Sequence, residues 1–563
     1  MRAGEAQATF AATLVDEWAR AGVRHAVVAP GSRSNPLAVA LDADDRIVVH
    51  VFLDERSASF CALGIGRATG VPAVVVTTSG TAAAECHAAV LEASHGRVPL
   101  LVCTADRPPE LQGVGAPQTV DQVGLYGRAV RWAAEPGVPD PATAGTWRSL
   151  GSRAVAEATG ARPGPVHLDL AFRDPLVGEP GDLPPGREDG APWHRIWPLR
   201  WPGSVEAVAA TLRSPRGLIV AGAGASRAGV AQLAQATGWP VLADPLSGCR
   251  VPGAVSAFDP ILRVRAFAEA HRPDVVVRVG ALPASKVLGE WLASAGARVV
   301  LLERAGAFLD PDRLAADIVP GGVAVLADLA RRLEGIGDPS WGAAWQTADD
   351  AAQGAIARVL AGREEVTEPA VARSLLAALP DGATLVVSSS MPVRDLEWYA
   401  AARDGVRVVA NRGANGIDGV VSTAVGVALA TGGPTALLIG DLALLHDTGG
   451  LLGLAERGVD LAIVVIDNRG GGIFSFLPQA RSLPAPRFER LLATPHEVDL
   501  PSLVAVYGLP ALRVHDADGL VPALTAAVHT PGPLVVVAPT DRAANVAVHD
   551  ELHAAVATAV DRR

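Results

Sequence analysis

Two polar residues, Asp441 and Asn468, each follow an apolar run of the kind that forms a buried parallel strand. The runs are Thr435–Ile439 and Leu461–Ile466, and the spacing of 27 positions between the two polar residues fits one strand–helix–strand unit. Because the carboxyl ends of parallel strands meet at one edge of a sheet, both side-chain oxygens can converge on one hard cation. A carboxylate, an amide oxygen and a nearby backbone carbonyl suit Mg²⁺ that still has sites for phosphate oxygens. The alternative is an ordinary strand–helix–strand unit in which Asp441 and Asn468 only cap turns.

A second acidic candidate, Glu55, follows the expected strand Ile47–Phe52 and begins a helical pattern that continues to Gly64. A carboxylate at this position can cap the helix and interact favourably with its dipole. Taken alone, Glu55 is better explained as a helix-start residue than as a catalytic acid. Its chemistry depends on what the other segments place beside it.

Three blocks of alternating strand-like and helix-like segments must position these residues, and we place them at 1–185, 193–345 and 364–563. Regular alternation predicts an α/β fold of three doubly wound parallel sheets. The stretch Val177–Pro192, rich in Pro, Gly and acidic residues, has the composition of a linker. The expected strands are His25–Ala29, Ile47–Phe52, Ala73–Thr77, Pro99–Thr104 and Pro165–Leu170 in the first block; Gly217–Gly222, Asp274–Gly280 and Arg298–Leu302 in the second; and Thr384–Ser388, Val406–Ala410, Thr435–Ile439, Leu461–Ile466 and Pro533–Ala538 in the third.

Composition and charge narrow the class of protein. The 563-residue chain has a net charge of −11 and no long basic run, which argues against nucleic acid or an anionic membrane surface as a partner. Its four cysteines have neither metal-ligand spacing nor a disulfide framework, so reduced thiols are expected. The first residues form an acidic amphipathic pattern unlike a signal peptide, and no charge-free apolar run reaches the ~18 residues of a membrane span. We therefore expect a cytoplasmic protein.

One glycine-rich segment of the middle block resembles a nucleotide-binding loop only in part. Gly222-Ala223-Gly224 follows an expected strand, but Arg227 stands where a dinucleotide fingerprint needs its third glycine. Nucleotide binding is therefore not expected there.

Five longer strings are more specific: Ala29–Pro36, Asp54–Ala58, Thr77–Ala82, Asn411–Gly419 and Gly440–Leu442. They resemble thiamine diphosphate (ThDP) enzymes and, among these, the family of 2-succinyl-5-enolpyruvyl-6-hydroxy-3-cyclohexene-1-carboxylate (SEPHCHC) synthases. The resemblance covers both outer blocks well and the middle block loosely. It implies that the three blocks are a pyrimidine-binding domain, a central α/β domain and a diphosphate-binding domain, in that order.

The resemblance also implies ThDP and Mg²⁺ as cofactors, with Mn²⁺ as an alternative metal. Glu55 then matches the acid that hydrogen-bonds the aminopyrimidine ring and favours the imino form that removes the thiazolium C2 proton. Asp441, Asn468 and the Gly470 carbonyl match the metal ligands. Ile417 matches an apolar wedge beneath ThDP, and the other matching cofactor-binding positions are Ser390, Gly440 and Leu442.

The implied enzyme is a transferase (a carboligase) of menaquinone biosynthesis. In its reaction 2-oxoglutarate loses CO₂, and the resulting carbanion adds in a 1,4 (Stetter-like) manner to isochorismate, giving SEPHCHC. Both substrates are dianions, which bidentate arginines bind well. For any single arginine the alternative is a solvated salt bridge. Besides Glu55, the residues predicted for catalysis or substrate binding are Ser32, Arg33, Arg107, Gln118, Lys286, Arg394 and Arg412.

Three positions depart from the expected patterns. Leu442 stands where most ThDP enzymes have glycine, and the SEPHCHC synthases also have leucine at this position. Pro117 replaces an expected Asn, which puts one polar contact to the acceptor in doubt, and Arg469 replaces a smaller amide. Phe474 and Leu477 either wall the acceptor pocket or simply pack in the core.

Two other functions compete with this interpretation. An acetohydroxyacid-synthase-like carboligase or 2-oxo acid decarboxylase acting on pyruvate is disfavoured by the arginine set and by Leu442. A catalytically silent, ligand-binding paralogue is disfavoured by the presence of Glu55, Asp441 and Asn468.

The resemblance further implies a homodimer, or a dimer of dimers (homotetramer), because the ThDP site of this superfamily lies between domains of two subunits. A regulatory site for an aromatic acid from later in the pathway is a further hypothesis. It rests on three arginines that end or flank apolar strands: Arg97, Arg278 and Arg304.

Overall fold

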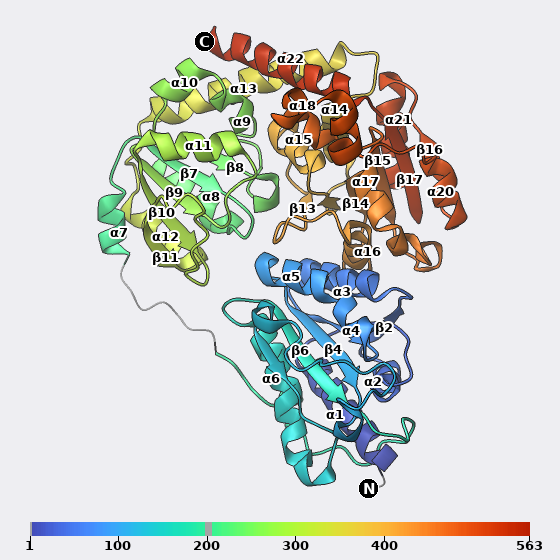
Figure 1. Ribbon diagram of the computed structural model, residues 1–563. Helices are drawn as coiled ribbons and strands as arrows, with labels where there is room; N and C mark the ends of the chain where they lie inside the picture. The colour runs from blue at the N-terminus through green and yellow to red at the C-terminus, as the bar shows by residue number, and fades with distance from the viewer. Residues whose placement is uncertain (1–2, 198–204, 563) are drawn as a thin grey trace. The chain divides into compact units, whose positions relative to one another are not determined.

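The computed structural model describes residues 3–197 and 205–562, and most of its elements are labelled in Figure 1. Three parallel sheets with covering helices confirm the predicted α/β fold. The chain forms two compact units: the first contains residues 1–198, 411–433 and 443–459, and the second contains residues 199–410, 434–442 and 460–563.

The first unit contains a six-stranded sheet in the order β2-β1-β3-β4-β6-β5, with every neighbouring pair parallel. Helix α1 contributes Phe10, Leu14 and Trp18 to its core, at the spacing of one helix face. The strands are β1 (His25–Val28), β2 (Val48–Val51), β3 (Ala73–Thr77), β4 (Leu100–Asp106), β5 (Trp132–Ala134) and β6 (Pro165–Ala171). The helices are α1 (Ala3–Arg20), α2 (Asn35–Asp42), α3 (Glu55–Thr69), α4 (Thr81–Glu85), α5 (His87–Gly96) and α6 (Trp147–Thr159).

Helix α16 (Val420–Thr431) also belongs to the first unit, where it packs directly on α3. Glycines allow the two backbones to approach closely. A Cβ atom at Gly64 would lie 2.1 Å from the Thr423 carbonyl oxygen, and one at Gly426 would lie 2.0 Å from that of Cys61. Any larger residue at these two positions would push the helices apart, so their spacing is set by the sequence.

The second unit contains two sheets, of which the first has the order β11-β10-β9-β7-β8. All its neighbouring strands are parallel, and the aromatic side chains of Trp341 and Trp345 pack in its core. The strands are β7 (Gly217–Ala221), β8 (Val241–Ala243), β9 (Val275–Val279), β10 (Arg298–Glu303) and β11 (Ala315–Pro320). The helices are α7 (Glu206–Thr211), α8 (Arg227–Thr237), α9 (Phe258–Leu262), α10 (Arg265–Ala270), α11 (Lys286–Ala295), α12 (Val323–Arg332) and α13 (Pro339–Ala361).

The other sheet of the second unit has the order β13-β12-β14-β15-β17-β16 and is again parallel throughout. Its strands are β12 (Thr384–Val387), β13 (Arg407–Val409), β14 (Thr435–Gly440), β15 (Leu461–Asp467), β16 (Ala511–Arg513) and β17 (Pro533–Pro539). The helices of this part are α14 (Glu368–Ala378), α15 (Met391–Tyr399), α18 (Gln479–Ser482), α19 (Ala485–Phe488), α20 (Leu500–Val506), α21 (Ala517–His529) and α22 (Arg542–Asp561). Helix α17 (Asp441–His446) begins in the second unit, and its residues from Ala443 onward belong to the first.

In each sheet the chain leaves two adjacent strands in opposite directions, and ligands of such folds bind at the carboxyl ends of these strands. The adjacent pairs are β1/β3, β7/β9 and β12/β14. Ser32 and Arg33 follow β1, Ser390 follows β12, and Asp441 follows β14. The topology therefore places these predicted site residues where a ligand is expected.

The structure differs from the sequence prediction in two respects. The strands β5, β8, β11 and β16 were not predicted. The segment between β14 and β15 is also less helical than expected, because α17 has six residues and is followed only by the 3₁₀ turns Thr448–Leu451 and Leu454–Glu456. Asp441 is thus the first residue of a short helix that directly follows the strand, with no intervening turn.

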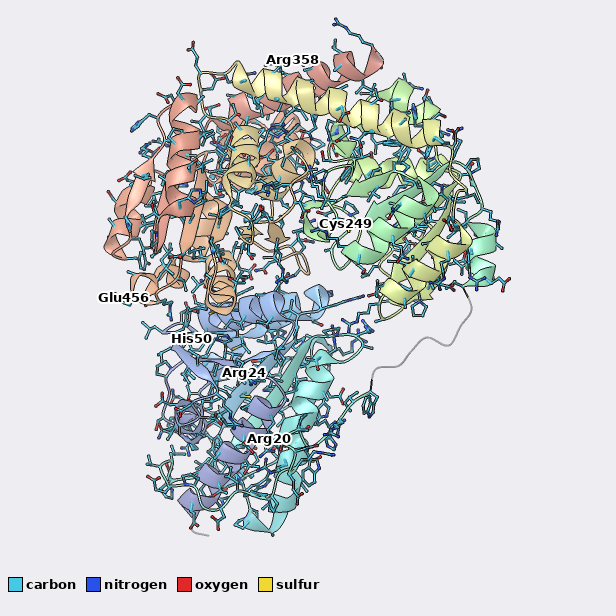
Figure 2. All side chains as sticks on the ribbon, turned by 180° about the vertical axis from the view of Figure 1, so that it is seen from behind. Arg20, Arg24, His50, Cys249, Arg358 and Glu456 are labelled. Carbon is cyan, nitrogen blue, oxygen red and sulfur yellow. The ribbon has the colours of Figure 1, made fainter. Side chains whose placement is uncertain are left out.

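All four cysteines are buried and free, as the sequence predicted, and Cys249 is labelled in Figure 2. Burial raises the pKa of Cys61 and of Cys86 to about 12, so both thiols are poor nucleophiles. Among the described helices, none has the length and apolar character that crossing a membrane requires.

Candidate functional site

Glu55 is the first residue of α3, but its neighbour caps the helix. Asp54 is the N-cap, and its carboxylate accepts a hydrogen bond from the Ser57 amide at 3.0 Å. Within the described part of the chain the Glu55 side chain makes no hydrogen bond or ion pair, and it lines a cavity of about 860 Å³ together with Ser79 and Gln118. The capping role that explained this carboxylate from sequence alone therefore belongs to Asp54, and Glu55 can contact a ligand in the cavity.

Two arginines of the first unit, Arg33 and Arg107, lie close enough for their charges to interact. Burial and then the charge of Arg33 lower the pKa of Arg107 below its ordinary value. Arg33 donates to the Phe172 carbonyl at 2.9 Å, and its ion-pair partner, Asp174, is 3.7 Å away and mostly exposed. Because their charges are only partly compensated, these guanidinium groups favour an anion such as a carboxylate.

Arg107 also connects this pair to the cavity that Glu55 lines. Its Nη1 donates to Ser79 Oγ at 2.7 Å, and its Nη2 donates to Gln118 Oε1 at 3.4 Å. Ser79 in turn donates to the Gln118 carbonyl at 2.9 Å. The structure thus places Gln118 and Glu55 on one cavity, with Arg107 hydrogen-bonded to two of its lining residues, whereas Ser32 is exposed and takes no part in these contacts.

A buried amide that the sequence did not indicate, Gln122, holds this region together. Its Oε1 accepts from the Gly80 amide at 2.8 Å, and its Nε2 donates to the Ala105 carbonyl at 3.1 Å and to Asp169 Oδ1 at 2.9 Å. Burial, followed by the charge of Asp106, raises the pKa of Asp169 to about 7. Gln122 therefore fixes the loop after β3 against the ends of β4 and β6.

The loop of residues 411–419, which carries Arg412 and Ile417, is anchored to α5 by a buried carboxylate. Glu92 accepts from the Gly413 amide at 2.8 Å and from the Ala414 amide at 2.7 Å. Arg412 and Ile417 are both partly exposed, and Arg412 has no ion-pair partner among the described residues. Glu92 thus defines the path of the loop without using the Arg412 charge.

The second unit holds the other candidate carboxylate, Asp441, which is 2% exposed. Its Oδ1 accepts from the Leu442 amide at 2.6 Å, and its Oδ2 accepts from the Gly470 amide at 2.9 Å. Burial raises the pKa of Asp441, although these two amides oppose the shift. Gly470 has φ of +150°, and a Cβ atom there would lie 2.5 Å from the Ala493 carbonyl oxygen, so glycine is required. Asp441 and the Gly470 backbone are therefore in direct contact.

Asn468 follows β15 and presents an oxygen that the protein does not use. Its Nδ2 donates to Glu368 Oε1 at 2.8 Å, while its Oδ1 is buried and has no hydrogen-bond partner within the described chain. A buried acceptor without a donor is costly, and a cation would satisfy it. The donor set of Asp441 and Asn468 therefore fits a hard metal ion.

Two further groups beside Asp441 were missed from the sequence. Ligand atoms of Asp441, Asp467 and His496 all lie within 4.8 Å of one another, and His496 Nε2 is 3.3 Å from Asp441 Oδ2. Asp467 ends β15 just before Asn468, so strand position was an available signal for it. His496 lies in an irregular segment that offered no pattern.

Ser390 has an unusual backbone conformation for a serine, with φ of 74° and ψ of −135° at the start of α15. This region is costly for residues other than glycine, and such strain often occurs at functional sites. The Ser390 carbonyl accepts from Arg394 Nη1 at 2.6 Å, one turn later. The strained turn and the arginine are thus linked directly.

Arg394 and Lys286 line the same cavity of about 690 Å³ in the second unit. Leu477 and Phe476 are among its apolar walls, whereas Phe474 is not. Lys286 is largely exposed and lies 3.4 Å from Glu290, a weak i,i+4 ion pair. The structure therefore brings the predicted cations Arg394 and Lys286 together.

The hypothetical regulatory arginines have different environments. Arg278 is buried in β9, donates to Asp310 at 2.6 Å and to the Leu309 carbonyl at 2.7 Å, and so has its charge balanced within the fold. Arg97 caps α5 in the first unit, and Arg304 is exposed after β10 in the second. Their role as an anion site stays a hypothesis.

Comparison with known proteins identifies the chain's relatives. Residues 8–125 match the N-terminal TPP binding domain of thiamine pyrophosphate enzymes, residues 191–387 match the middle domain of thiamine pyrophosphate, and residues 398–538 match the C-terminal TPP binding domain. A 2-succinyl-5-enolpyruvyl-6-hydroxy-3-cyclohexene-1-carboxylate synthase from Thermobifida fusca is 48% identical over 98% of this chain and 99% of its own length. Synthases of the same name from Myxococcus xanthus (98% and 97% covered) and Chloroflexus aurantiacus (99% and 97%) are 42% and 40% identical. The chain belongs to the SEPHCHC synthase family.

Members of this family are ThDP-dependent enzymes, and the two matched binding domains identify thiamine diphosphate as the cofactor (thiamine pyrophosphate is the same compound). The N-terminal match contains Glu55, Arg33, Arg107 and Gln118. The C-terminal match contains Asp441 and Asn468. The resemblance drawn from the five strings is therefore confirmed at the level of family and cofactor.

Proposed function

We propose that the protein catalyses the SEPHCHC synthase reaction of menaquinone biosynthesis: decarboxylation of 2-oxoglutarate followed by 1,4-addition of the remaining four-carbon unit to isochorismate. The names of the relatives support this reaction. Thiamine diphosphate, when bound, supplies the carbon nucleophile. The residues of the chain bind and orient the two dianions, and Glu55 holds a proton against the aminopyrimidine ring.

The contact network around Arg107 is the observation that carries the proposal. Arg107 is bonded to Ser79 and Gln118, which line the cavity that Glu55 lines, and Arg33 adds a second cation. A monoanionic substrate such as pyruvate needs fewer cations than these. In the second unit, Arg394 and Lys286 supply two more charges beside an apolar wall, which suits a ring-bearing dicarboxylate.

We also propose that Asp441, Asn468 and the Gly470 carbonyl hold Mg²⁺, or Mn²⁺ in its place, with Gly440, Leu442, Ser390 and Ile417 contacting the cofactor. The buried, unpaired Asn468 Oδ1 supports this donor set. A cation beside Asp441 would favour its ionised form and so offset the burial that raises its pKa. We further propose that the three domains span residues 1–185, 193–345 and 364–563. The proposed active assembly is a homodimer or a dimer of dimers.

The test is a product assay with the purified protein, ThDP, Mg²⁺, 2-oxoglutarate and isochorismate, with NMR detection of the adduct and measurement of CO₂ release. We expect one CO₂ and one SEPHCHC for each isochorismate consumed. A parallel reaction with pyruvate alone measures acetolactate. Formation of acetolactate without any consumption of isochorismate would contradict the proposal and favour the acetohydroxyacid-synthase-like alternative.

A further inference from the structure

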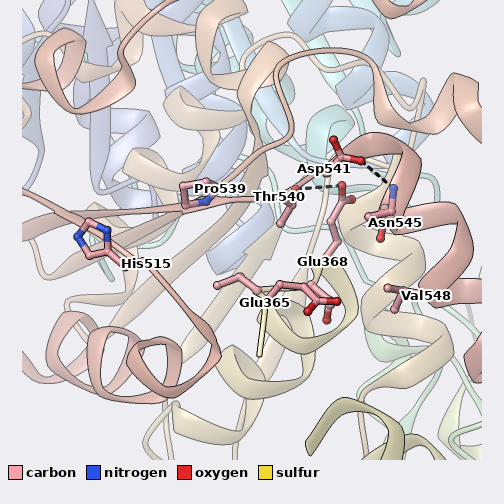
Figure 3. A pocket seen from close by; sticks show the side chains of 11 residues that line it. Glu365, Glu368, His515, Pro539, Thr540, Asp541, Asn545 and Val548 are labelled. Atoms are coloured by element: carbon pink, nitrogen blue, oxygen red, sulfur yellow. Dashed lines mark hydrogen bonds between the residues drawn. The ribbon is translucent and has the colours of Figure 1, made fainter. Parts of the chain in front are cut away.

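Glu368 is a buried carboxylate for which neither the helix cap nor an ion pair accounts. It is 1% exposed and is the first residue of α14, but Thr367 caps that helix by accepting from the Ala370 amide. Glu368 Oε1 accepts from Asn468 Nδ2 at 2.8 Å and from Thr540 Oγ1 at 3.4 Å. Figure 3 shows Glu368 beside Thr540, which follows β17. One carboxylate oxygen is thus fixed by two donors.

The contact with Glu368 decides which way the Asn468 amide faces. The oxygen and nitrogen of an amide are nearly the same in size, but only the oxygen is a lone-pair donor to a metal. Glu368 Oε1 also accepts from Thr540, so it acts as an acceptor here. Rotating the Asn468 amide by half a turn would bring Oδ1 against this oxygen, and two acceptors would face each other. With the observed contact, Nδ2 is bound and Oδ1 is the atom left for a ligand.

Gly472 limits the space around the Asn468 side chain, whose orientation Glu368 sets. A Cβ atom at Gly472 would lie 2.5 Å from Asn468 Nδ2, so the amide lies directly against the backbone. On this side only a residue without a side chain leaves room for the amide. The geometry therefore allows the Asn468 side chain little freedom apart from the half-turn, which Glu368 excludes.

We propose that Glu368 is a positioning residue that turns the Asn468 amide so that its oxygen, and not its nitrogen, faces the cation. The proposal rests on the metal site put forward under the proposed function. Partners of metal ligands commonly contribute about 10- to 100-fold to metal affinity through such orientation. Glu368 does not itself contact the metal in this account, and its effect is transmitted entirely by Asn468.

The test compares Glu368→Leu with Glu368→Gln. Leucine is apolar and cannot accept from Asn468 Nδ2. Glutamine has equal length, and its oxygen can accept from both Asn468 Nδ2 and Thr540 Oγ1, the two donors that Glu368 Oε1 has now, which favours the same orientation. A cavity of about 290 Å³ beside Glu368, lined also by His515, Asp541 and Asn545, leaves space for either side chain (Figure 3). Circular dichroism and the thermal midpoint establish that each variant folds.

The readout is Mn²⁺ affinity in the presence of ThDP, measured from the free-ion signal by electron paramagnetic resonance, with no substrate. We expect Glu368→Leu to weaken Mn²⁺ binding by about 10- to 100-fold and Glu368→Gln to weaken it by less than about threefold. If the negative charge of Glu368 were what matters, the Mn²⁺ affinity of Glu368→Gln would fall as far as that of Glu368→Leu. That result would overturn the proposal.

A second comparison separates positioning from a general structural effect. In a protein that already carries Asn468→Ala, Glu368→Leu should cause no further loss of Mn²⁺ affinity, because the residue it acts through is gone. An equal loss in both backgrounds would overturn the proposal. So would a wild-type protein that binds no Mn²⁺ with ThDP. Normal Mn²⁺ behaviour without SEPHCHC formation would instead overturn the proposed reaction and leave the role of Glu368 supported.

Discussion

The carboxylate of Asp395 lies 2.6 Å from Nε2 of His549, and this almost fully buried pair joins α15 to α22. Burial disfavours a charged imidazole, but the charge and hydrogen bond of Asp395, together with the Asn545 carbonyl and Glu368, outweigh burial and raise the pKa of His549. His549 also lines the cavity that Arg394 and Lys286 share. The pair therefore supports the wall of a candidate substrate pocket.

Asp395→Asn should destabilise the protein by ~3–5 kcal/mol, because it leaves a buried imidazole without its charged partner. The stability from this pair is fully present below the ordinary histidine pKa of ~6.5 and is lost as pH rises through the higher folded value. Urea denaturation followed by circular dichroism at pH 6 and at pH 9 should therefore show a larger effect at pH 6. As a control, Arg265→Ala removes an exposed i,i+4 pair with Glu269 and should cost less than ~1 kcal/mol. Equal effects of the two substitutions would refute the prediction.

Glu55→Gln should lower kcat by about 10²- to 10⁴-fold, the range of a lost acid–base contribution, while ThDP still binds. The amide keeps the size of the side chain but cannot hold and release the proton. Glu85 lines the same cavity, so Glu85→Gln is a matched control for loss of one negative charge. It should leave kcat within about threefold of wild type. Single-turnover measurements with saturating ThDP test both, and unchanged turnover of Glu55→Gln would exclude the assigned role.

The interior strands could be predicted from the sequence because they are largely apolar, although His167 and Asp169 interrupt β6 and Arg278 interrupts β9. β3 was predicted with its observed limits, and β15 within one residue. The four strands that were missed, β5, β8, β11 and β16, all lie at sheet edges. β5, β8 and β16 have only three residues each, and most residues of β11 are partly exposed, so these strands lack the long apolar signal of strands that are paired on both sides.

Candidate site residues could be predicted where they occur in contiguous strings. They could not be predicted where the residues in contact are far apart in the sequence. Glu55 and Asn468 were predicted from their positions after apolar runs, together with the strings that resemble ThDP enzymes. Glu92 contacts Gly413, 321 positions away, and Glu368 contacts Asn468, 100 positions away. No local pattern encodes such pairs, because each depends on how distant elements pack together.

Arg107→Lys should raise the KM of one dicarboxylate substrate by about 10-fold or more while changing kcat less. Lysine keeps the positive charge. Its single ammonium group cannot donate to Ser79 and Gln118 as the planar guanidinium does and at the same time bind a substrate carboxylate. Separate titrations of 2-oxoglutarate and isochorismate would identify which substrate Arg107 holds. Arg173→Lys is the control, because Arg173 forms an exposed pair with Glu110 and should leave both KM values unchanged. Identical KM values for wild type and Arg107→Lys would contradict a binding role.

Asp169→Asn should become more stabilising, relative to wild type, as the pH rises from about 4 to 7. Burial and then the charge of Asp106 raise the pKa of Asp169 to about 7, and no described residue donates a hydrogen bond to its buried Oδ2 that would stabilise a negative charge there. The unfolded chain loses this proton near pH ~3.9, so between that value and pH 7 the wild-type protein loses up to roughly 4 kcal/mol of stability. The asparagine variant has no proton to lose, and its Oδ1 can still accept from Thr104 and Gln122. Urea denaturation at pH 5, 6, 7 and 8 should show that the difference in unfolding free energy between Asp169→Asn and wild type increases with pH and then stays constant above pH 7. A difference that does not change with pH would show that Asp169 is ionised throughout.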